Sequence, residues 1–464
     1  MKPLLMSVLF LLMTVLPIAG AGGQDAKPLA VADERYKTDI LLVVAHPDDE
    51  GAATAYLARA LDEGKRVAVV FGTRGSSGGN EVGTEQALAL GAIREIEARR
   101  ALGTMGITNV WFLGGKDTAS QDVLQSLANW AHGAALEQLV RLVRLTRPEV
   151  VLTFLPGTFI GEDHGDHQAS GVLASEAFDL AGDPTVFPSQ VAVPLRRLEP
   201  YLEGLRPWQA KKIYYFPDAD REDIFKGKGP EYSVKEISKS SKKAYWRASL
   251  DSFRLHETQA KSFVDQLNKM DDAAIEKMMA ADGWTDVQRF VLGKSLVGGS
   301  VTGPVFEGVT AETIPFRREA FSVEAAPAEL SVTLAGPWDF YAEFRRAHGL
   351  GHLPYPEPPE IALQAGTSLV IPLWVRNPTG ASREVTLSAN LPGGWTVANG
   401  GTGKFVVAAK QTSAARIEIN LPPLADPKKT KEDARDVTVR AESNGTNVGV
   451  VKLRVELRKR ALSE

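Results

Sequence analysis

The stretch Ile40-Leu41-Leu42-Val43-Val44-Ala45-His46-Pro47-Asp48-Asp49-Glu50 decides how the first half of this 464-residue chain folds. Its six apolar residues predict a buried strand, because strands covered on both faces read as continuous hydrophobic runs. The strand delivers one histidine and three carboxylates to the opening of a helix, where Pro47 suits the first helical position. In open α/β sheets, ligands bind beyond the carboxyl ends of the strands. The segment His46–Glu50 is therefore a candidate for a catalytic site.

A second cluster of the same kind follows a second apolar run. Val150–Phe154 predicts another strand, and Asp163-His164-Gly165-Asp166-His167 comes shortly after it. Two histidine–carboxylate clusters, each just beyond a strand, suggest one metal site built from both. Taken alone, His46–Glu50 could be an acidic helix start with a chance histidine, since carboxylates are favoured in a first turn. Two histidines within four positions of the second cluster are harder to explain in that way.

Strands and helices alternate between about residues 38 and 180. Further strands are expected at Val67–Phe71 and Val110–Leu113, and helices at 50–63, between Gly83 and about Gly106, and at 124–145 and 167–180. This alternation predicts an α/β fold, a Rossmann-like and mostly parallel sheet with helices on both faces.

The composition changes after about residue 303, where proline becomes frequent. Pro354–Pro359 reads as a stiff linker. Beyond it, short apolar runs separated by turn sequences predict an all-β antiparallel sandwich. We therefore expect a signal peptide at 1–21, an α/β domain at 38–300, a connecting region at 301–359 and a β-sandwich at 360–458.

The first residues have the pattern of a secretory signal peptide. Lys2 is followed by the apolar run Leu4–Ile18 and by Ala19-Gly20-Ala21, a small-residue cleavage site before Gly22. This predicts export to the periplasm or the outside of the cell, with no membrane-spanning segment after cleavage. An uncleaved anchor is the alternative, although the apolar run is shorter than the roughly 20 residues that a span needs.

The overall composition narrows the classes of partner and site. The net charge of −4 provides no basic field, so we expect no nucleic-acid partner. The chain has no cysteine, which excludes disulfides and leaves His, Asp and Glu as metal ligands.

The spacing of the two clusters fits metal-assisted hydrolysis. His46 and Asp49 are three residues apart, as are His164 and His167, so each pair can point to one place. Two histidines and one aspartate with an open fourth position make a catalytic zinc site, in which bound water has a pKa of about 7. Another carboxylate can then act as base. A remaining histidine, oriented by Asp166, can stabilise the oxyanion and protonate the leaving amine.

At this point the chain resembles a known family. Ala45–Glu50, together with the distant His164-x-Asp166-His167, is similar to the PIG-L/LmbE-type metal-dependent N-acetylglucosaminyl deacetylases, over roughly residues 38–265. The further matching pieces are Arg94-Glu95-Ile96-Glu97 with Leu102-Gly103, Phe112-Leu113-Gly114 with Asp117, and His256-x-Thr258-Gln259.

The resemblance implies a role for each matching residue. His46, Asp49 and His167 would hold the metal, and Asp48 would be the general base. His164, paired with Asp166, would be the acid or oxyanion partner. Arg94 and Asp117 would contact the sugar, the alternatives being a helix-surface ion pair and a turn aspartate.

Two features concern the substrate and the C-terminal region. The loop Thr73–Gly78 carries serine where many members of the family have an acidic residue, so the resemblance does not determine the identity of the substrate. Val375–Pro378 and Leu391–Val397 are similar to immunoglobulin-like modules of some secreted glycosidases. Trp395 is expected to anchor a core rather than to stack on a sugar.

The sequence therefore predicts an exported zinc-dependent hydrolase, with Fe²⁺ as the alternative ion, that removes an N-acetyl group. We expect a small-molecule or glycan substrate that contains N-acetylglucosamine, and contact with cell-surface glycans through the C-terminal domain. One alternative is an amidase for another N-acylated amine. Another is a non-catalytic carbohydrate- or surface-binding protein, which the intact Asp48 disfavours because a binding scaffold needs no base beside its metal.

Overall fold

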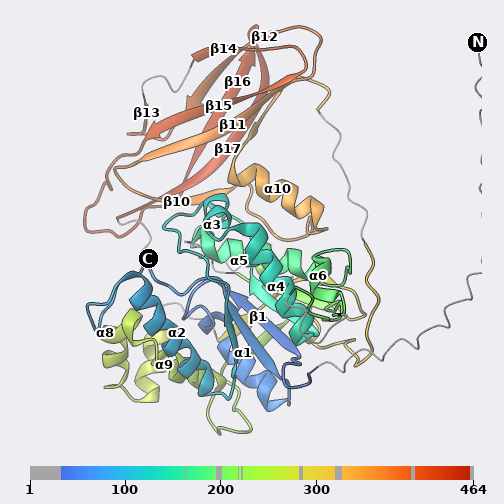
Figure 1. Cartoon of the computed structure of the whole chain (residues 1–464). Coiled ribbons are helices and arrows are strands. Elements are labelled where there is room, and N and C mark those ends of the chain that lie inside the picture. Colours follow the sequence, from blue (N-terminus) through green and yellow to red (C-terminus); the bar gives the residue numbers. More distant parts are fainter. Residues whose placement is uncertain are drawn as a thin grey trace, which may run out of the picture.

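The computed structural model describes residues 33–459 except 162–163, 195–200, 218, 221–222, 282–285, 319–326 and 399–402. The expected signal peptide at 1–21 and Asp163 of the second cluster lie outside the described residues. An α/β unit is followed by a region of strands (Figure 1). Within the described ranges, each helix is too short or too polar to cross a bilayer.

The α/β unit is built on a six-stranded sheet with the order β3-β2-β1-β4-β5-β8. The strands are β1 (Ile40–Val44), β2 (Val67–Phe71), β3 (Asn109–Phe112), β4 (Val150–Phe154), β5 (Lys212–Phe216) and β8 (Val291–Ser295). All neighbours are parallel except β5 and β8, so the predicted mostly parallel sheet is confirmed. The strand order changes direction between β1 and β4, and the loops that leave these two strands therefore diverge and open a crevice.

Helices cover both faces of this sheet, as predicted. Ile40, Leu42 and Val44 face one core, with α1 (Gly51–Asp62) and α2 (Ala87–Gly103). The alternate residues of β1 face a second core, which contains side chains of α3 (Val123–Asn129), α4 (His132–Thr146) and α5 (Gly165–Leu180). Figure 1 shows the second group of helices between the sheet and the C-terminal strands.

Helix α1 begins at Gly51, within one residue of the predicted start, and Pro47, which suits a first helical position, lies in the loop before it. Carboxylates of this segment accept hydrogen bonds from its backbone N–H groups. Asp49 Oδ2 accepts from the N–H of His46 at 2.6 Å, and Glu50 Oε2 accepts from the N–H of Asp48 at 2.9 Å. Asp48 consequently has a φ of 105°. The segment His46–Glu50 is a tight loop rather than a first turn.

The single helix expected at 124–145 is two helices, α3 and α4. The chain breaks between them at Ala131, whose φ is 52°. The indole of Trp130 packs against Gly72 and Gly115, and a Cβ at Gly115 would lie 2.7 Å from Trp130 Cγ. The break thus places a large ring under the loops that follow β2 and β3.

The rest of the α/β unit is less regular. The stretch from Tyr245 to Ala281 forms three helices, with His256 between the first two. The elements are α6 (Pro188–Val191), the 3₁₀ turn Asp223–Phe225, β6 (Glu231–Ser233), α7 (Tyr245–Phe253), α8 (Glu257–Leu267), α9 (Asp272–Ala281) and β7 (Val287–Arg289).

The C-terminal region consists of two sheets that share one core, so the all-β prediction is confirmed. The predicted antiparallel arrangement does not hold throughout, because β10 pairs with β17 in parallel. One has the order β10-β17-β16-β12-β14 and the other β13-β15-β11-β9. Trp395 is buried in this core. The strands are β9 (Ser331–Leu334), β10 (Glu360–Gln364), β11 (Ser368–Asn377), β12 (Arg383–Asn390), β13 (Thr396–Val397), β14 (Gly403–Val407), β15 (Gln411–Asn420), β16 (Arg435–Ser443) and β17 (Thr446–Arg458).

The region 301–359, expected to be a connection, carries structure that ties the two parts together. Strand β9 pairs with β11, so the sandwich takes in a strand from before residue 360. The helix α10 (Pro337–Ala347) buries Tyr341 and Phe344 in a core of the α/β unit. The sequence did not predict these two elements, because their apolar patterns are short and the region is rich in proline.

Candidate metal and substrate site

The loop after β1 places His46 and Asp49 side by side. Asp49 Oδ2 accepts from the backbone N–H groups of Ala45 and His46, at 3.1 and 2.6 Å, which fixes its carboxylate at the end of the strand. His46 Nδ1 lies 3.4 Å from the same oxygen. Two residues of one tight loop therefore offer one nitrogen and one oxygen to the same point.

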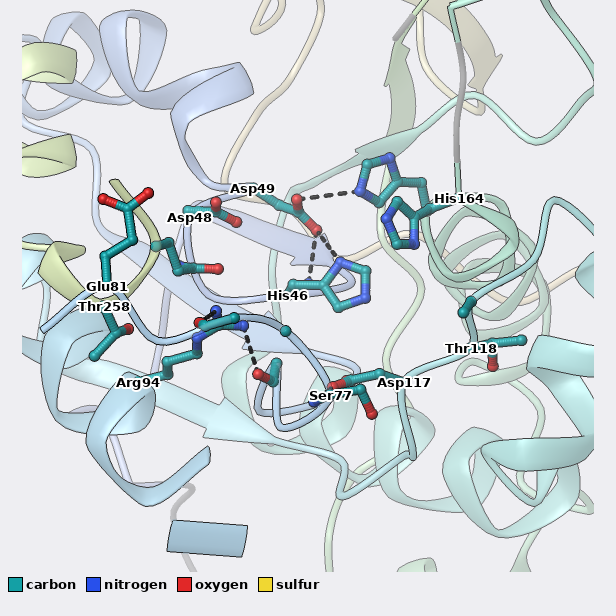
Figure 2. A pocket seen from close by; sticks show the side chains of 16 residues that line it. His46, Asp48, Asp49, Ser77, Glu81, Arg94, Asp117, Thr118, His164 and Thr258 are labelled. Atoms are coloured by element: carbon teal, nitrogen blue, oxygen red, sulfur yellow. Dashed lines mark hydrogen bonds and ion pairs between the residues drawn. The ribbon is translucent and has the colours of Figure 1, made fainter. Parts of the chain in front are cut away.

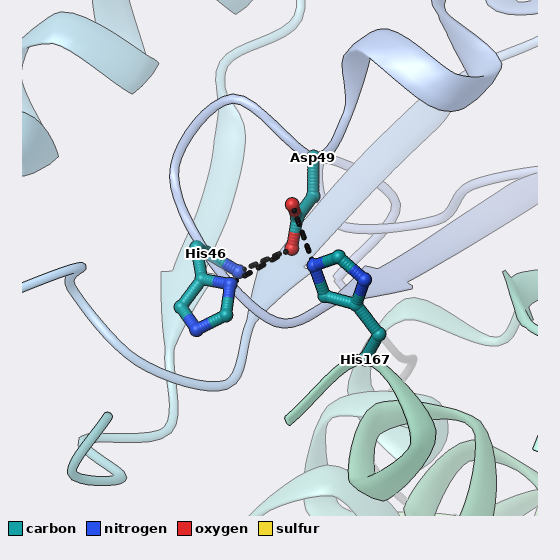
Figure 3. Close-up of side chains that lie close together, drawn as sticks. All are labelled: His46, Asp49 and His167. Carbon is teal, nitrogen blue, oxygen red and sulfur yellow. Dashed lines mark hydrogen bonds and ion pairs between the residues drawn. The ribbon is translucent and has the colours of Figure 1, made fainter. Parts of the chain in front are cut away.

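His167 reaches this point from the other side of the crevice. It lies in the first turn of α5, and its Nε2 is 3.2 Å from Asp49 Oδ1 (Figure 3). Its ring stacks on Phe154 of β4, with 4.2 Å between the ring centroids and an interplanar angle of 2°. The end of β4 thus fixes the orientation of the histidine, and side chains 118 positions apart along the chain meet.

The donor set fits a divalent metal. The donor atoms of His46, Asp49 and His167 all lie within 4.8 Å of one another. In a tetrahedral site with bonds of about 2.0–2.1 Å, neighbouring donors are about 3.3–3.4 Å apart. His46 Nδ1 lies 3.4 Å from Asp49 Oδ2 and His167 Nε2 lies 3.2 Å from Asp49 Oδ1, so each histidine is at about this separation from a different oxygen of the carboxylate. The role of these three residues as ligands remains a prediction that the geometry supports.

Asp166 supports His46, and its pairing with His164 stays a prediction, since ligand atoms of His46, His164 and Asp166 lie within 4.8 Å of one another. Asp166 is fully buried, and its Oδ2 is 3.2 Å from His46 Nε2 and accepts from the N–H of Thr118 at 2.8 Å. The buried first turn of α5 directs this carboxylate beneath the loop after β1, a placement that sequence spacing does not encode. With Nε2 protonated, His46 donates to Asp166 and leaves Nδ1 for a metal, as carboxylate–histidine–metal sites require.

The charges in this cluster shift several pKa values. Burial lowers the pKa of His46, but the carboxylates of Asp49 and Asp166 outweigh burial and raise it to about 10. Burial raises the pKa of Asp49, but the charges of His167 and His46 outweigh burial and hold this pKa well below the ordinary value. Burial, reinforced by the charges of His46 and His167, lowers the pKa of His164 to about 4. A neutral His164 therefore lies beside a charged cluster.

Asp48 is the carboxylate next to the candidate ligands. Burial and then the charge of Asp49 raise its pKa from 3.8 to about 7. A carboxyl group with such a value can exchange a proton near neutral pH, as a general base must. Asp48 and His164 line the same pocket with His46 and Asp49 (Figure 2).

The pocket has a volume of about 420 Å³, within the roughly 300–1,000 Å³ of small-molecule sites. Arg94 and Asp117 line it, as predicted for sugar contacts, but their hydrogen bonds hold the glycine- and serine-rich loop after β2. Arg94 donates to the carbonyls of Gly75 at 2.5 Å and Gly79 at 2.8 Å. Asp117 Oδ2 accepts from the N–H of Ser77 at 2.6 Å. Contact with a sugar remains a prediction for both.

Sequence reasoning missed what lies behind Asp48. Glu50 and His256 are buried and form a pair, and Thr258 and Gln259 line the pocket. The motif His256-x-Thr258-Gln259 was the available signal. The family resemblance includes this motif, but the sequence does not show that His256 pairs with Glu50, which is 206 positions away along the chain.

The comparisons with known proteins concern the part of the chain that carries this site. Residues 41–178 match the family described as PIG-L, GlcNAc-PI de-N-acetylase. The chain is 29% identical over 244 residues to a 1D-myo-inositol 2-acetamido-2-deoxy-alpha-D-glucopyranoside deacetylase of Thermobifida fusca (strain YX), which covers 47% of this chain and 82% of that protein. It is 32% identical over 219 residues to a deacetylase of the same name from Streptomyces scabiei (strain 87.22), covering 44% of this chain and 61% of the relative.

Among solved structures, the chain is similar to the N,N'-diacetylchitobiose deacetylase of Pyrococcus horikoshii. The TM-score is 0.38 at 19% identity, covering 60% of this chain and 89% of that one. The chain spans less than two thirds of the length of most of the curated relatives compared, as the Streptomyces match illustrates. The family match lies on the strands and loops that carry both clusters, and the chain therefore contains a PIG-L family domain at residues 41–178.

Proposed function

We propose that this protein is a metal-dependent N-deacetylase that hydrolyses the N-acetyl group of a substrate containing N-acetylglucosamine, with zinc as the metal. The observation that carries the proposal is the convergence of His46, Asp49 and His167 beside the carboxylate of Asp48 in one pocket. The family match and the names of the relatives support this chemistry and this class of sugar.

His46, Asp49 and His167 would hold the ion, which would supply Lewis acidity to the attacking water and to the acetyl carbonyl. Asp48 takes the proton from the water as it attacks. His164 lines the same pocket and would donate a hydrogen bond to the carbonyl oxygen, on which negative charge develops. The acetate leaves, and the amine takes up the proton that Asp48 received.

The direct test is acetate release over a panel of N-acetylated substrates. The panel should include N-acetylglucosamine glycosides, N-acetylgalactosamine glycosides and acetylated amines without a sugar. Release confined to the non-sugar amides would support an amidase instead. The Asp48→Asn variant should keep the metal and lose acetate release by about 10²- to 10⁴-fold, because only proton transfer is removed. Acetate release within about tenfold of the wild type would exclude Asp48 as the base.

We also propose export and a role for the C-terminal sandwich as an immunoglobulin-like module that contacts cell-surface glycans. The residues at 1–21 have the pattern of a signal peptide, which supports export. N-terminal sequencing of the mature protein and fractionation of the producing cells test this.

Removal of the sandwich should leave turnover of a soluble substrate unchanged and weaken retention on glycan surfaces. Because α10 packs on the α/β unit, the truncation should begin at residue 360.

A further inference from the structure

Two buried side chains from distant parts of the chain meet behind Asp48. Glu50 and His256 are each 1% exposed, and His256 Nε2 lies 2.6 Å from Glu50 Oε1. The other carboxylate oxygen of Glu50 accepts from the backbone N–H of Asp48 at 2.9 Å. The pair is therefore connected directly to the backbone of the residue that we propose as the base.

The backbone at this residue requires external support. Asp48 has a φ of 105°, a region that side-chain-bearing residues adopt only where their surroundings enforce it. The preceding residue is also held, because Gln259 Nε2 donates to the carbonyl of Pro47 at 2.7 Å. The N–H and the C=O of the peptide group between Pro47 and Asp48 are thus each bound by a side chain.

These contacts come from a fixed platform. Thr258, between His256 and Gln259 in sequence, donates to Glu97 of α2 from its N–H at 2.9 Å and from its hydroxyl at 2.6 Å. Its carbonyl accepts from the N–H of Glu81 at 3.0 Å. The start of α8 is therefore anchored to α2 and to the loop that forms the pocket wall.

We propose that His256, Glu50 and Gln259 are positioning residues that hold Asp48 in its left-handed conformation, so that its carboxylate faces the candidate metal ligands. The inference rests on the proposed function, in which Asp48 is the base. A purely structural role for the pair is less satisfactory, since a buried charged pair adds little net stability over apolar packing. It also leaves unexplained why the second oxygen of Glu50 binds the backbone of Asp48.

The test compares His256→Leu, His256→Gln and Gln259→Leu with the wild type in the metal-loaded full chain. Glutamine at 256 can still donate to Glu50, whereas leucine cannot. His132→Leu is the matched control, because His132 Nε2 lies 2.6 Å from Glu176 Oε2 in another histidine–glutamate pair that does not line the pocket. The measurements are kcat and KM for acetate release, metal content per chain and thermal unfolding.

For His256→Leu we expect kcat to fall about 10- to 100-fold, the usual effect of removing a residue that orients a site, with KM and metal content within twofold. His256→Gln should recover most of the loss. Gln259→Leu should lower kcat by a smaller factor, and His132→Leu should match the wild type. Gln259 is only partly buried, so its variant carries the test if His256→Leu does not fold.

Unchanged kcat in folded His256→Leu and Gln259→Leu would overturn the proposal. So would a loss in His256→Leu that only follows the folded fraction and is not recovered by glutamine. A crystal structure of the metal-loaded His256→Leu protein gives an independent answer: Asp48 should leave the positive-φ region, and an unchanged φ would overturn the inference. If the wild type releases no acetate from any substrate, the proposed function fails, while this structural readout still decides the positioning role.

Discussion

Asp166 offers the sharpest test of how the candidate metal centre is organised. We predict that Asp166→Asn weakens zinc binding, because Asp166 Oδ2 is the partner of His46 Nε2 at 3.2 Å. Asparagine keeps the volume and one acceptor oxygen, removes the charge, and replaces the other oxygen by an NH2 donor. A hydrogen bond to a charged group contributes about 1.5–3 kcal/mol and a neutral one about 0.5–1.5.

The substitution thus removes about 1–1.5 kcal/mol from the support of His46, which corresponds to a roughly 5- to 12-fold higher Kd for zinc. Asp166→Ala should have a larger effect, about 10- to 100-fold, because it also leaves the N–H groups of His46 and Thr118 without their acceptor.

The assay is competition for zinc with a chromophoric chelator at constant pH. The control is Asp122→Ala, which removes the side-chain cap of α3, where Asp122 Oδ1 accepts from the N–H of Leu124 at 2.9 Å. It should lower the free energy of unfolding by about 1 kcal/mol and leave the Kd for zinc unchanged. A general loss of stability is thereby separated from a loss of metal affinity.

An Asp166→Asn protein that binds zinc within twofold of the wild type would refute this reasoning. A strongly reduced kcat in the same protein would instead support the predicted pairing of Asp166 with His164.

Three further predictions follow from the same geometry. Burial and then neighbouring charge raise the pKa of Asp48 from 3.8 to about 7. Because a base must be deprotonated, kcat/KM should fall about tenfold for each pH unit as the pH is lowered from 7 towards 3.8. An Asp48→Asn variant with the same decrease would contradict this. Gly78→Ala should raise KM and lower the melting temperature, because the new Cβ would lie 2.6 Å from Arg94 Nη1. Gly79→Ala is the control, since a Cβ at Gly79 would have no atom within 4 Å. Equal effects of the two substitutions would contradict the prediction. Trp395→Ala should destabilise the sandwich by about 3–5 kcal/mol in calorimetry while acetate release from a soluble substrate persists; an unchanged transition would show that Trp395 is not a core anchor.

Much of the fold follows from local patterns. The apolar runs at β1 and β4 predicted buried strands within one residue of their observed ends, because hydrophobic continuity is a property of the segment itself. The break between α3 and α4 was not predictable in this way. It depends on Trp130 packing against glycines from two other loops.

The sequence alone also determined which side chains could form the site, since histidine and carboxylate clusters after two strands are visible in the chain. Only the tertiary structure decided their partners. Asp166 lies 3.2 Å from His46 of the other cluster, and Glu50 pairs with His256 from across the domain. The physical reason is that β1 and β4 lie side by side where the strand order changes direction, so contacts there join loops that are distant in sequence. The spacing of residues along the chain determines which side chains share one face of a helix. The packing of loops from different strands determines which of their atoms lie within contact distance.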